Sequence, residues 1–227
     1  MKRSSWWLLE LATAVTYTDS AEQESEPASL LCREQVGLTV GWKNRMTKSD
    51  NKRLFNAIEG NDWPTIDTIL QKYPSEIDAY GIHNRLCRDK TPLMYAMQCE
   101  NFALARRFID LGAAVCAKMA GGPGMSVLAL AAKFGHGLNP NHGEWVAFAS
   151  ELIQRGADPT EALWPALAAY DIRNGKSDMV KLLIDAGADL DSEIPAGRIR
   201  DLVKVNEHLF ADDVLTMCGI DRQTASA

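Results

Sequence analysis

Apolar residues recur at helical spacing in three segments of the chain, and each segment is followed by a Gly-Ala pair. The segments are "LARRFIDL", "FASELIQR" and "MVKLLIDA", and the glycines that follow them are Gly112, Gly156 and Gly187. Apolar positions three and four residues apart form one stripe along a helix. A glycine directly after such a helix favours the positive φ at which the chain can reverse. Each segment is therefore predicted to be an amphipathic helix that ends in a tight turn.

A second kind of apolar segment, rich in small residues, precedes each of these helices. Its three copies are "TPLMYAM", "SVLALAA" and "LWPALAA". Neither helix of such a pair can bury its apolar face alone, so neighbouring pairs must stack. The pattern predicts a repeated unit of helix, turn, helix and glycine.

The longest intact copy, "TPLMYAMQCENFALARRFIDLGAAV" from Thr91 to Val115, resembles an ankyrin repeat and opens on that family's Thr-Pro-Leu. The next copy keeps the family's Gly-His at Gly135 and His136, although Ser-Val replaces its Thr-Pro. The last copy lacks Thr-Pro but keeps the second helix and the Gly-Ala-Asp ending. A degenerate first copy runs from Arg53 to Tyr73, where polar replacements suit a terminal repeat that faces water.

The resemblance implies an all-α fold, an ankyrin-repeat helical solenoid of about four repeats with a helical C-terminal cap. We expect an N-terminal extension at 1–47, repeats over 48–192, capping helices over 193–220 and a tail at 221–227. Within 48–192 the repeats are placed at about 51–81, 86–118, 125–159 and 162–192.

Composition and charge exclude some classes of partner. The 227 residues carry 24 Lys and Arg against 30 Asp and Glu, a formal net charge of −6. Nucleic-acid binders usually present a basic face, so we expect no nucleic-acid partner. No apolar run reaches the roughly 18–20 residues that a membrane span needs, so we expect no membrane partner.

The cysteines and the N-terminus bear on the compartment. Five scattered cysteines without a C-x-x-C pair favour reduced thiols and a cytoplasmic protein. The N-terminal Lys2 and Arg3, followed by an apolar stretch, resemble a signal peptide, but Glu10 interrupts that stretch. Secretion is the alternative to a cytoplasmic location.

An insertion, "GLNPNHGEW", follows the Gly-His of the third copy and brings His142 and Glu144 near His136. The resemblance implies that His136 hydrogen-bonds backbone in the turn between repeats. A zinc site needs four ligands, and no cysteine lies nearby, so we expect no metal. The insertion is predicted to be an elongated turn that projects from one edge of the stack, a candidate contact element.

Catalytic motifs are not recognisable in the sequence. It contains no G-x-S-x-G, H-E-x-x-H, phosphate-binding loop or dinucleotide fingerprint. No base is predictable for Cys87 or Cys99, which are interpreted as ordinary small residues. We expect no catalytic residue, no cofactor and no small-molecule substrate. An enzyme that uses the divergent C-terminal segment is the alternative of another class.

The resemblance implies a protein-binding module whose concave face is formed by loops and first helices. The centre of that face is expected across the second and third repeats. The expected partner-binding residues are Arg88, Lys90, Gln98, Cys99, Met125, Lys133, Phe134, Tyr170, Asp171 and Arg173. The partner is expected to be another protein, bound either by an adaptor or by an inhibitor of the immunity or antitoxin type that covers the active site of a toxin or effector.

Overall fold

The computed structural model describes residues 45–121, 124–170 and 176–221. Most of the N-terminal extension, the C-terminal tail, Asp171 and Arg173 lie outside these residues. The described chain is helical except for one two-residue strand pair, β1 (Glu193–Ile194) with β2 (Gly197–Arg198). The all-α prediction is therefore confirmed. The chain divides into two compact units, one ending at Val127 and the other beginning at Leu128.

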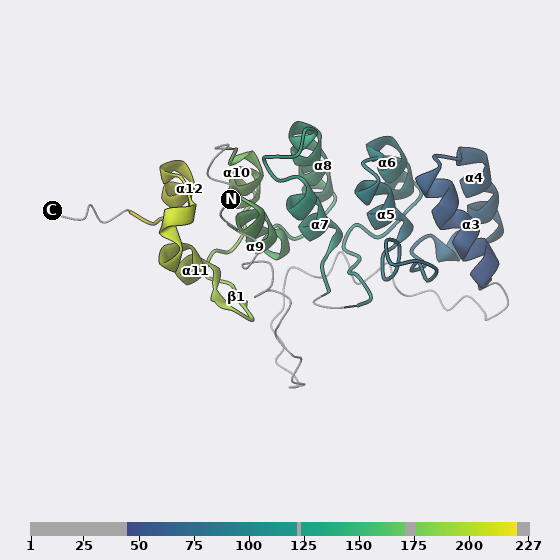
Figure 1. The fold of residues 1–227 in the computed structure, drawn as a ribbon, viewed down its shortest axis with the longest axis horizontal. Helices are drawn as coiled ribbons and strands as arrows, with labels where there is room; N and C mark the ends of the chain where they lie inside the picture. The colour runs from purple at the N-terminus through teal and green to yellow at the C-terminus, as the bar shows by residue number, and fades with distance from the viewer. Residues whose placement is uncertain (1–44, 122–123, 171–175, 222–227) are drawn as a thin grey trace, which may run out of the picture. The chain divides into compact units, whose positions relative to one another are not determined.

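The described part of the first unit, from residue 45 on, contains two helix pairs joined by a long loop (Figure 1). Helices α3 (Lys48–Glu59) and α4 (Trp63–Lys72) form one pair, and a 3-10 turn, η3 (Pro74–Glu76), follows them. Helices α5 (Pro92–Gln98) and α6 (Phe102–Asp110) form the next pair. Helix α5 packs on both α6 and α3, as expected for units that bury their apolar faces against neighbours.

Side-chain caps explain where these helices begin. The Thr91 hydroxyl accepts a hydrogen bond from the Met94 amide, and Pro92 stands in the first turn, where a missing N–H costs nothing. Asp62 and Asn101 cap α4 and α6 in the same way, through the amides of Thr65 and Leu104. The Thr-Pro-Leu of the sequence therefore marks a helix start.

The apolar core of this unit lies between its helix pairs. Leu54, Phe55, Leu93, Leu104 and Phe108 have no exposed surface. Polar contacts add to this packing at the rim of α4 and α6.

These rim contacts join the second helices of the two pairs. The Asn101 amide donates to Asn61 Oδ1 at 2.8 Å, and Arg107 holds both carboxylate oxygens of Asp67 at 2.7 and 2.8 Å. The Arg107 guanidinium also lies 4.9 Å from the centre of the Trp63 ring. Together, these contacts of Asn101 and Arg107 fix the register in which α6 packs beside α4.

The predicted glycine turns are present. Gly112, Gly156 and Gly187 have φ values of 95°, 95° and 91°, a region that side chains other than glycine rarely enter. Each directly follows the C-cap residue of a second helix. The spacing of Gly-Ala in the sequence therefore reports the ends of these helices.

The residues of the second unit that the structure describes form three helix pairs. They are α7 (Val127–Phe134) with α8 (His142–Gln154), α9 (Thr160–Ala169) with α10 (Asp178–Asp185), and α11 (Ile199–Val205) with α12 (Asp212–Met217). A 3-10 turn, η4 (Glu207–Leu209), joins the last two helices. Helix α10 contacts α8, α9 and α12, so it is central to this unit.

The insertion is a turn, as the sequence predicts, only over residues 137–141, and its second half is helical. Helix α8 begins inside it at His142, whose residue surface is only 5% exposed. The His142 ring donates from Nδ1 to the Gly135 carbonyl at 2.7 Å, and its Nε2 lies 3.1 Å from Asp178 Oδ2 on α10. The role expected of His136 therefore belongs to His142, which ties the start of α8 to the start of α10.

Substitutions on α10 separate its core face from its outer face. Leu183 has no exposed surface, whereas the adjacent Leu182 is only half-buried. Leu183→Ala should lower the free energy of unfolding by about 2–5 kcal/mol, because it leaves a cavity in the core. Leu182→Ala should cost clearly less. Urea denaturation of both variants measures the difference, and equal losses would contradict the assignment of the core face.

Two substitutions in the insertion test its buried end. His142→Ala should lower the free energy of unfolding by about 1–3 kcal/mol, because the Gly135 carbonyl loses its donor inside the fold. Leu138, which is 59% exposed, is the matched control, and Leu138→Ser should change stability little. Thermal melts of the two variants are the measurement. If His142→Ala leaves the melting temperature unchanged, the buried end of the insertion does not contribute to the stability of the fold.

Candidate functional site

The predicted partner-binding residues fall into two groups, one in each unit. Arg88, Lys90, Gln98, Cys99 and Met125 lie in the first unit, and Lys133, Phe134 and Tyr170 lie in the second. Asp171 and Arg173 lie outside the described residues. Each group is therefore described within its own unit.

The loop before α5, residues 80–90, carries Arg88 and Lys90 and is closed by its own backbone. The Gly81 amide donates to the Lys90 carbonyl at 2.9 Å, and the Asp89 amide donates to the Gly81 carbonyl at 3.2 Å. At the tip, Asn84 Oδ1 accepts from the amides of Leu86 and Cys87, both at 2.8 Å. The loop is therefore a defined structure rather than a slack connection.

Exposed apolar side chains on this loop escaped the sequence analysis. Tyr80 is 40%, Ile82 47% and Leu86 54% exposed, and Arg85 beside them is exposed as well. The helical spacing used to find core residues says nothing about a loop. The available signal was aliphatic residues within a turn centred on Asn84, where polar residues are usual.

The side chains of Lys90 and Met125 are less accessible to a partner than the sequence predicted. The Lys90 ammonium donates to the Leu86 carbonyl at 2.7 Å, so the side chain folds back on its own loop. Met125 is half-buried, and its carbonyl accepts from the Met119 amide in the turn before α7. Arg88, in contrast, is exposed.

Gln98 and Cys99 are the accessible end of α5, whose other residues are all buried. The Gln98 Oε1 atom is buried and lacks a hydrogen-bond partner in the described structure. Cys99 is exposed as a residue, but desolvation of its thiol raises its pKa, and the nearby Glu59 carboxylate raises it further. The thiol therefore stays protonated at neutral pH and is a weak nucleophile.

The aromatic members of the second group take part in packing. The Phe134 ring lies 5.9 Å from the ring of Trp145, a side chain with no exposed surface, and Tyr170 stacks on Phe210 at 5.8 Å. Both residues are half-buried, as is Lys133. Substitutions of Phe134 therefore affect the packing of α7 and α8 as well as any surface it presents.

A Cys-His-Asn group in the 80–90 loop has the residue types of a cysteine hydrolase. Cys87 Sγ lies 3.3 Å from His83 Nδ1, and Asn84 Nδ2 lies 3.1 Å from His83 Nε2. The amide N–H of Asn84 can only donate, so Nε2 accepts and Nδ1 carries the proton that points at the sulfur. Such a ring cannot take the thiol proton, and Cys87 has no exposed surface. The group therefore locks the loop and does not act as a nucleophile and base.

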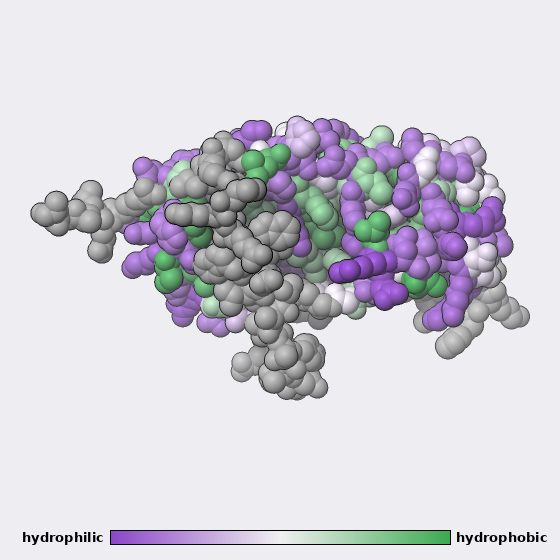
Figure 2. Space-filling model, in the orientation of Figure 1, coloured by the Kyte–Doolittle hydropathy of each residue, from purple (hydrophilic) through white to green (hydrophobic). Residues whose placement is uncertain are grey.

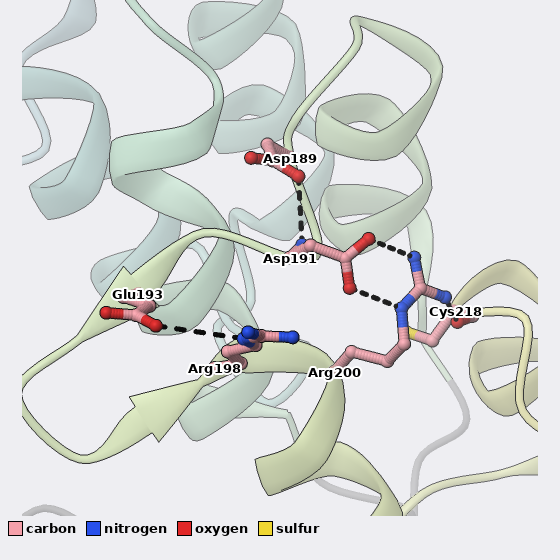
Figure 3. A network of polar contacts seen from close by, with 6 residues as sticks. All are labelled: Asp189, Asp191, Glu193, Arg198, Arg200 and Cys218. Carbon is pink, nitrogen blue, oxygen red and sulfur yellow. Dashed lines mark hydrogen bonds and ion pairs between the residues drawn. The ribbon is translucent and has the colours of Figure 1, made fainter. Parts of the chain in front are cut away.

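A network of polar contacts lies in the C-terminal segment (Figure 3). This segment is the place where an enzyme of the alternative class would carry its catalytic residues. Arg200 contacts both carboxylate oxygens of Asp191, at 2.8 and 3.1 Å, and donates to the Cys218 carbonyl at 2.6 Å. The hydrogen bond from Arg200 holds the pKa of Asp191 below its usual value, and burial raises the pKa of Cys218 to about 11. The network therefore contains a fixed ion pair and an inert thiol, and it clamps α11 and α12 to the end of the last repeat.

Metal ligands do not gather in the parts of the chain that the structure describes, where no group of three His, Cys, Asp or Glu residues could hold an ion. Both ring nitrogens of His142 are engaged, and Glu144 is exposed. The described helices also include none that is long and apolar enough to span a membrane.

The cysteines differ in oxidation state and exposure. Cys87, Cys99 and Cys218 are free thiols, whereas Cys116 is disulfide-bonded, so the expectation of reduced thiols fails at Cys116. Among the free thiols in the described part of the chain, only Cys99 is exposed.

Alkylation of the native protein should follow this order. Cys99 should react first, slowly at neutral pH and faster as the pH rises, because only the thiolate reacts. Cys87 and Cys218 should react only after unfolding in urea. Site-resolved mass spectrometry measures the order. Fast labelling of Cys87 in the folded protein would show an activated thiol in the 80–90 loop.

Comparisons with known proteins agree with the helix-pair architecture. Residues 161–193 match the family model of the ankyrin repeat. No curated protein matches the sequence.

The solved structures that are similar to this chain include two that differ in kind. The ankyrin repeat domain of human ASB11 is similar with a TM-score of 0.47 and 17% identity, over 73% of this chain and 65% of that domain. The chain thus spans less than two thirds of the length of that domain. A chain of the complex between the predatory endopeptidase Bd0816 of Bdellovibrio bacteriovorus and the immunity protein Bd3460 is similar with a TM-score of 0.41 and 20% identity, over 73% of this chain and 97% of that one. The family match over residues 161–193, together with the helix pairs that end at Gly112, Gly156 and Gly187, confirms the predicted resemblance to the ankyrin repeat.

Proposed function

We propose that this protein is a non-catalytic module that binds a partner protein through its loops and the ends of its first helices. In the first unit this surface comprises Arg88, Lys90, Gln98, Cys99 and Met125. In the second unit it comprises Lys133, Phe134 and Tyr170. The sequence adds Asp171 and Arg173, which lie outside the described residues. Ankyrin repeats are in general protein-interaction units, which agrees with this assignment.

The observation that carries the proposal is the unmet hydrogen-bond acceptor at the end of α5. A buried amide oxygen without a donor costs a protein about 1–3 kcal/mol, so such atoms are rare in folded structures. Gln98 Oε1 is in this state at the only end of α5 that reaches the surface. A donor from a partner would satisfy the oxygen once the side chain turns outward.

The chemistry of the same surface argues against catalysis there. Catalysis by an activated nucleophile requires a base within hydrogen-bond reach. The exposed thiol of Cys99 has a raised pKa, and Cys87 is buried against a ring that donates to it. Recognition of another macromolecule is what these side chains support.

The partner decides between an adaptor and an inhibitor. If the partner is an enzyme, loss of its activity on binding identifies an inhibitor that covers an active site. Retained activity identifies an adaptor. Both outcomes leave the proposed surface unchanged.

Gln98→Met tests the proposed surface, because it keeps the shape of the side chain and removes the orphan oxygen. The free protein should melt at the same or a higher temperature, since the unpaired acceptor is gone. Affinity for a partner identified by affinity capture should fall by about tenfold or more if Gln98 is an anchor. Titration calorimetry of the full chain gives the affinity.

Gln71→Met, on the exposed side of α4, is the matched control and should leave both quantities unchanged. Arg88→Ala and Lys133→Ala extend the test to the loop and to α7. If Gln98→Met, Arg88→Ala and Lys133→Ala all fold and all bind the partner with unchanged affinity, the proposed surface is not the binding surface.

A further inference from the structure

We infer that the 80–90 loop is the anchor by which this protein docks onto an acidic, partly apolar protein surface. The inference rests on the proposed function, because it names the partner chemistry of one part of the proposed surface. It is carried by the side chains that the loop exposes, by their charge and by the rigidity of the loop.

The exposed side chains of the loop are apolar where a turn would normally be polar. Tyr80, Ile82 and Leu86 are each at least two-fifths exposed within seven residues of sequence. The other large exposed apolar residues of the described chain, Leu111, Leu138 and Val205, are far from one another in the sequence. Single exposed apolar residues are ordinary, whereas a group of them on one tip is typical of an interaction site.

Basic side chains lie among these apolar ones. Arg85 and Arg88 are exposed, and neither forms an ion pair within the described residues. His83 lies in the same loop as these arginines. Burial is the main cause that lowers the pKa of His83, and the positive charge of Lys52 on α3 lowers it further. Figure 2 shows hydrophobic and strongly hydrophilic atoms side by side along the lower edge of this unit.

The charge of the loop departs from that of the whole protein. Residues 45–127 contain eleven Lys and Arg against nine Asp and Glu, whereas residues 128–221 contain eight against fifteen. The loop itself contains three basic residues and one acidic residue, Asp89. A partner with an acidic surface therefore gains electrostatic complementarity here, which raises association rate and specificity, and an apolar recess would supply affinity.

The loop is held in one conformation before any partner binds. A Cβ atom on Gly81 would clash with the backbone carbonyl of Cys87, so only glycine permits the closure of the loop. Asp89 has a φ of 64°, an unusual value for a residue with a side chain, and its carbonyl accepts from the Ala120 amide at 3.0 Å. The Tyr80 hydroxyl donates to the Lys118 carbonyl at 2.8 Å.

These contacts fix the tip from both sides. Strained backbone that the surroundings maintain is common at binding sites. A loop ordered in advance loses less conformational entropy on binding, which favours affinity.

A protein partner fits these side chains better than a nucleic acid does. Single-stranded nucleic acid is bound by stacked aromatic rings, and the loop exposes only Tyr80 of that kind. Ile82 and Leu86 are aliphatic and gain by burial in an apolar recess.

Selection of a random displayed peptide library on the full chain tests the inference without knowledge of the partner. Selected peptides should be enriched in Asp and Glu next to apolar residues. Their affinity, measured by fluorescence anisotropy, should fall by about tenfold or more for Ile82→Ser/Leu86→Ser and for Arg85→Gln/Arg88→Gln. Binding should also weaken with added salt.

Matched controls come from the same unit. Leu111→Ser removes an equally exposed apolar side chain, and Arg53→Gln removes an exposed cation, and both should bind as the wild type does. Melts of every variant establish that the fold is intact.

Three results would overturn the inference. The first is a selection in which the acid-rich peptides bind both loop variants as tightly as the wild type. The second is single-stranded RNA binding with the same loop dependence and higher affinity than the peptides. The third is loop-dependent self-association in sedimentation velocity, which would assign the loop to a second copy.

The proposed function can survive such a failure. Peptides that bind independently of the loop but lose affinity with Gln98→Met leave the proposed surface in place and exclude only the 80–90 loop as its anchor. Peptides insensitive to both would count against the proposed function as well.

Discussion

The burial of apolar helix faces between neighbouring helix pairs is the constraint on which this structure depends. A helix such as α5 buries all of its residues but the last, because α3 packs on one of its sides and α6 on another. Burial of that extent removes the helix side chains from any other role. In a helix of this kind only the end is left at the surface, and the loop before α5 carries the exposed apolar side chains Ile82 and Leu86.

The polar contacts follow from the same constraint. Once apolar packing sets the spacing of the pairs, side chains at the helix starts can reach the next pair. Asn101 reaches Asn61 in the first unit, and His142 reaches Asp178 in the second. Arg200 closes the last repeat against the C-terminal helices by contacts to Asp191 and the Cys218 carbonyl. These contacts select one register from several that apolar packing alone would allow.

The sequence predicted what depends on local chemistry and missed what depends on neighbours. The Thr-Pro start of α5 and the glycine turns follow from backbone preferences, and both were predictable. The choice between Leu182 and Leu183 was not, because adjacent apolar residues on a helix differ only in what packs against them. The hydrogen bond to the turn backbone that was expected of His136 is made by His142, and this depends on where α8 begins within the insertion. The exposed apolar tip of the 80–90 loop lies outside any helical period. The domain bounds and the surface that spans the repeats stay predictions.

Hydrogen–deuterium exchange of the full chain, free and bound to its captured partner, tests most directly the claim that loops and helix ends do the binding. The account predicts slower exchange on binding in residues 82–88 of the loop and at residues 98–100, while the buried amides of α4 and α6 exchange as before. Slower exchange confined to the outer surfaces of α4 and α6, with no change in the loop, would contradict it.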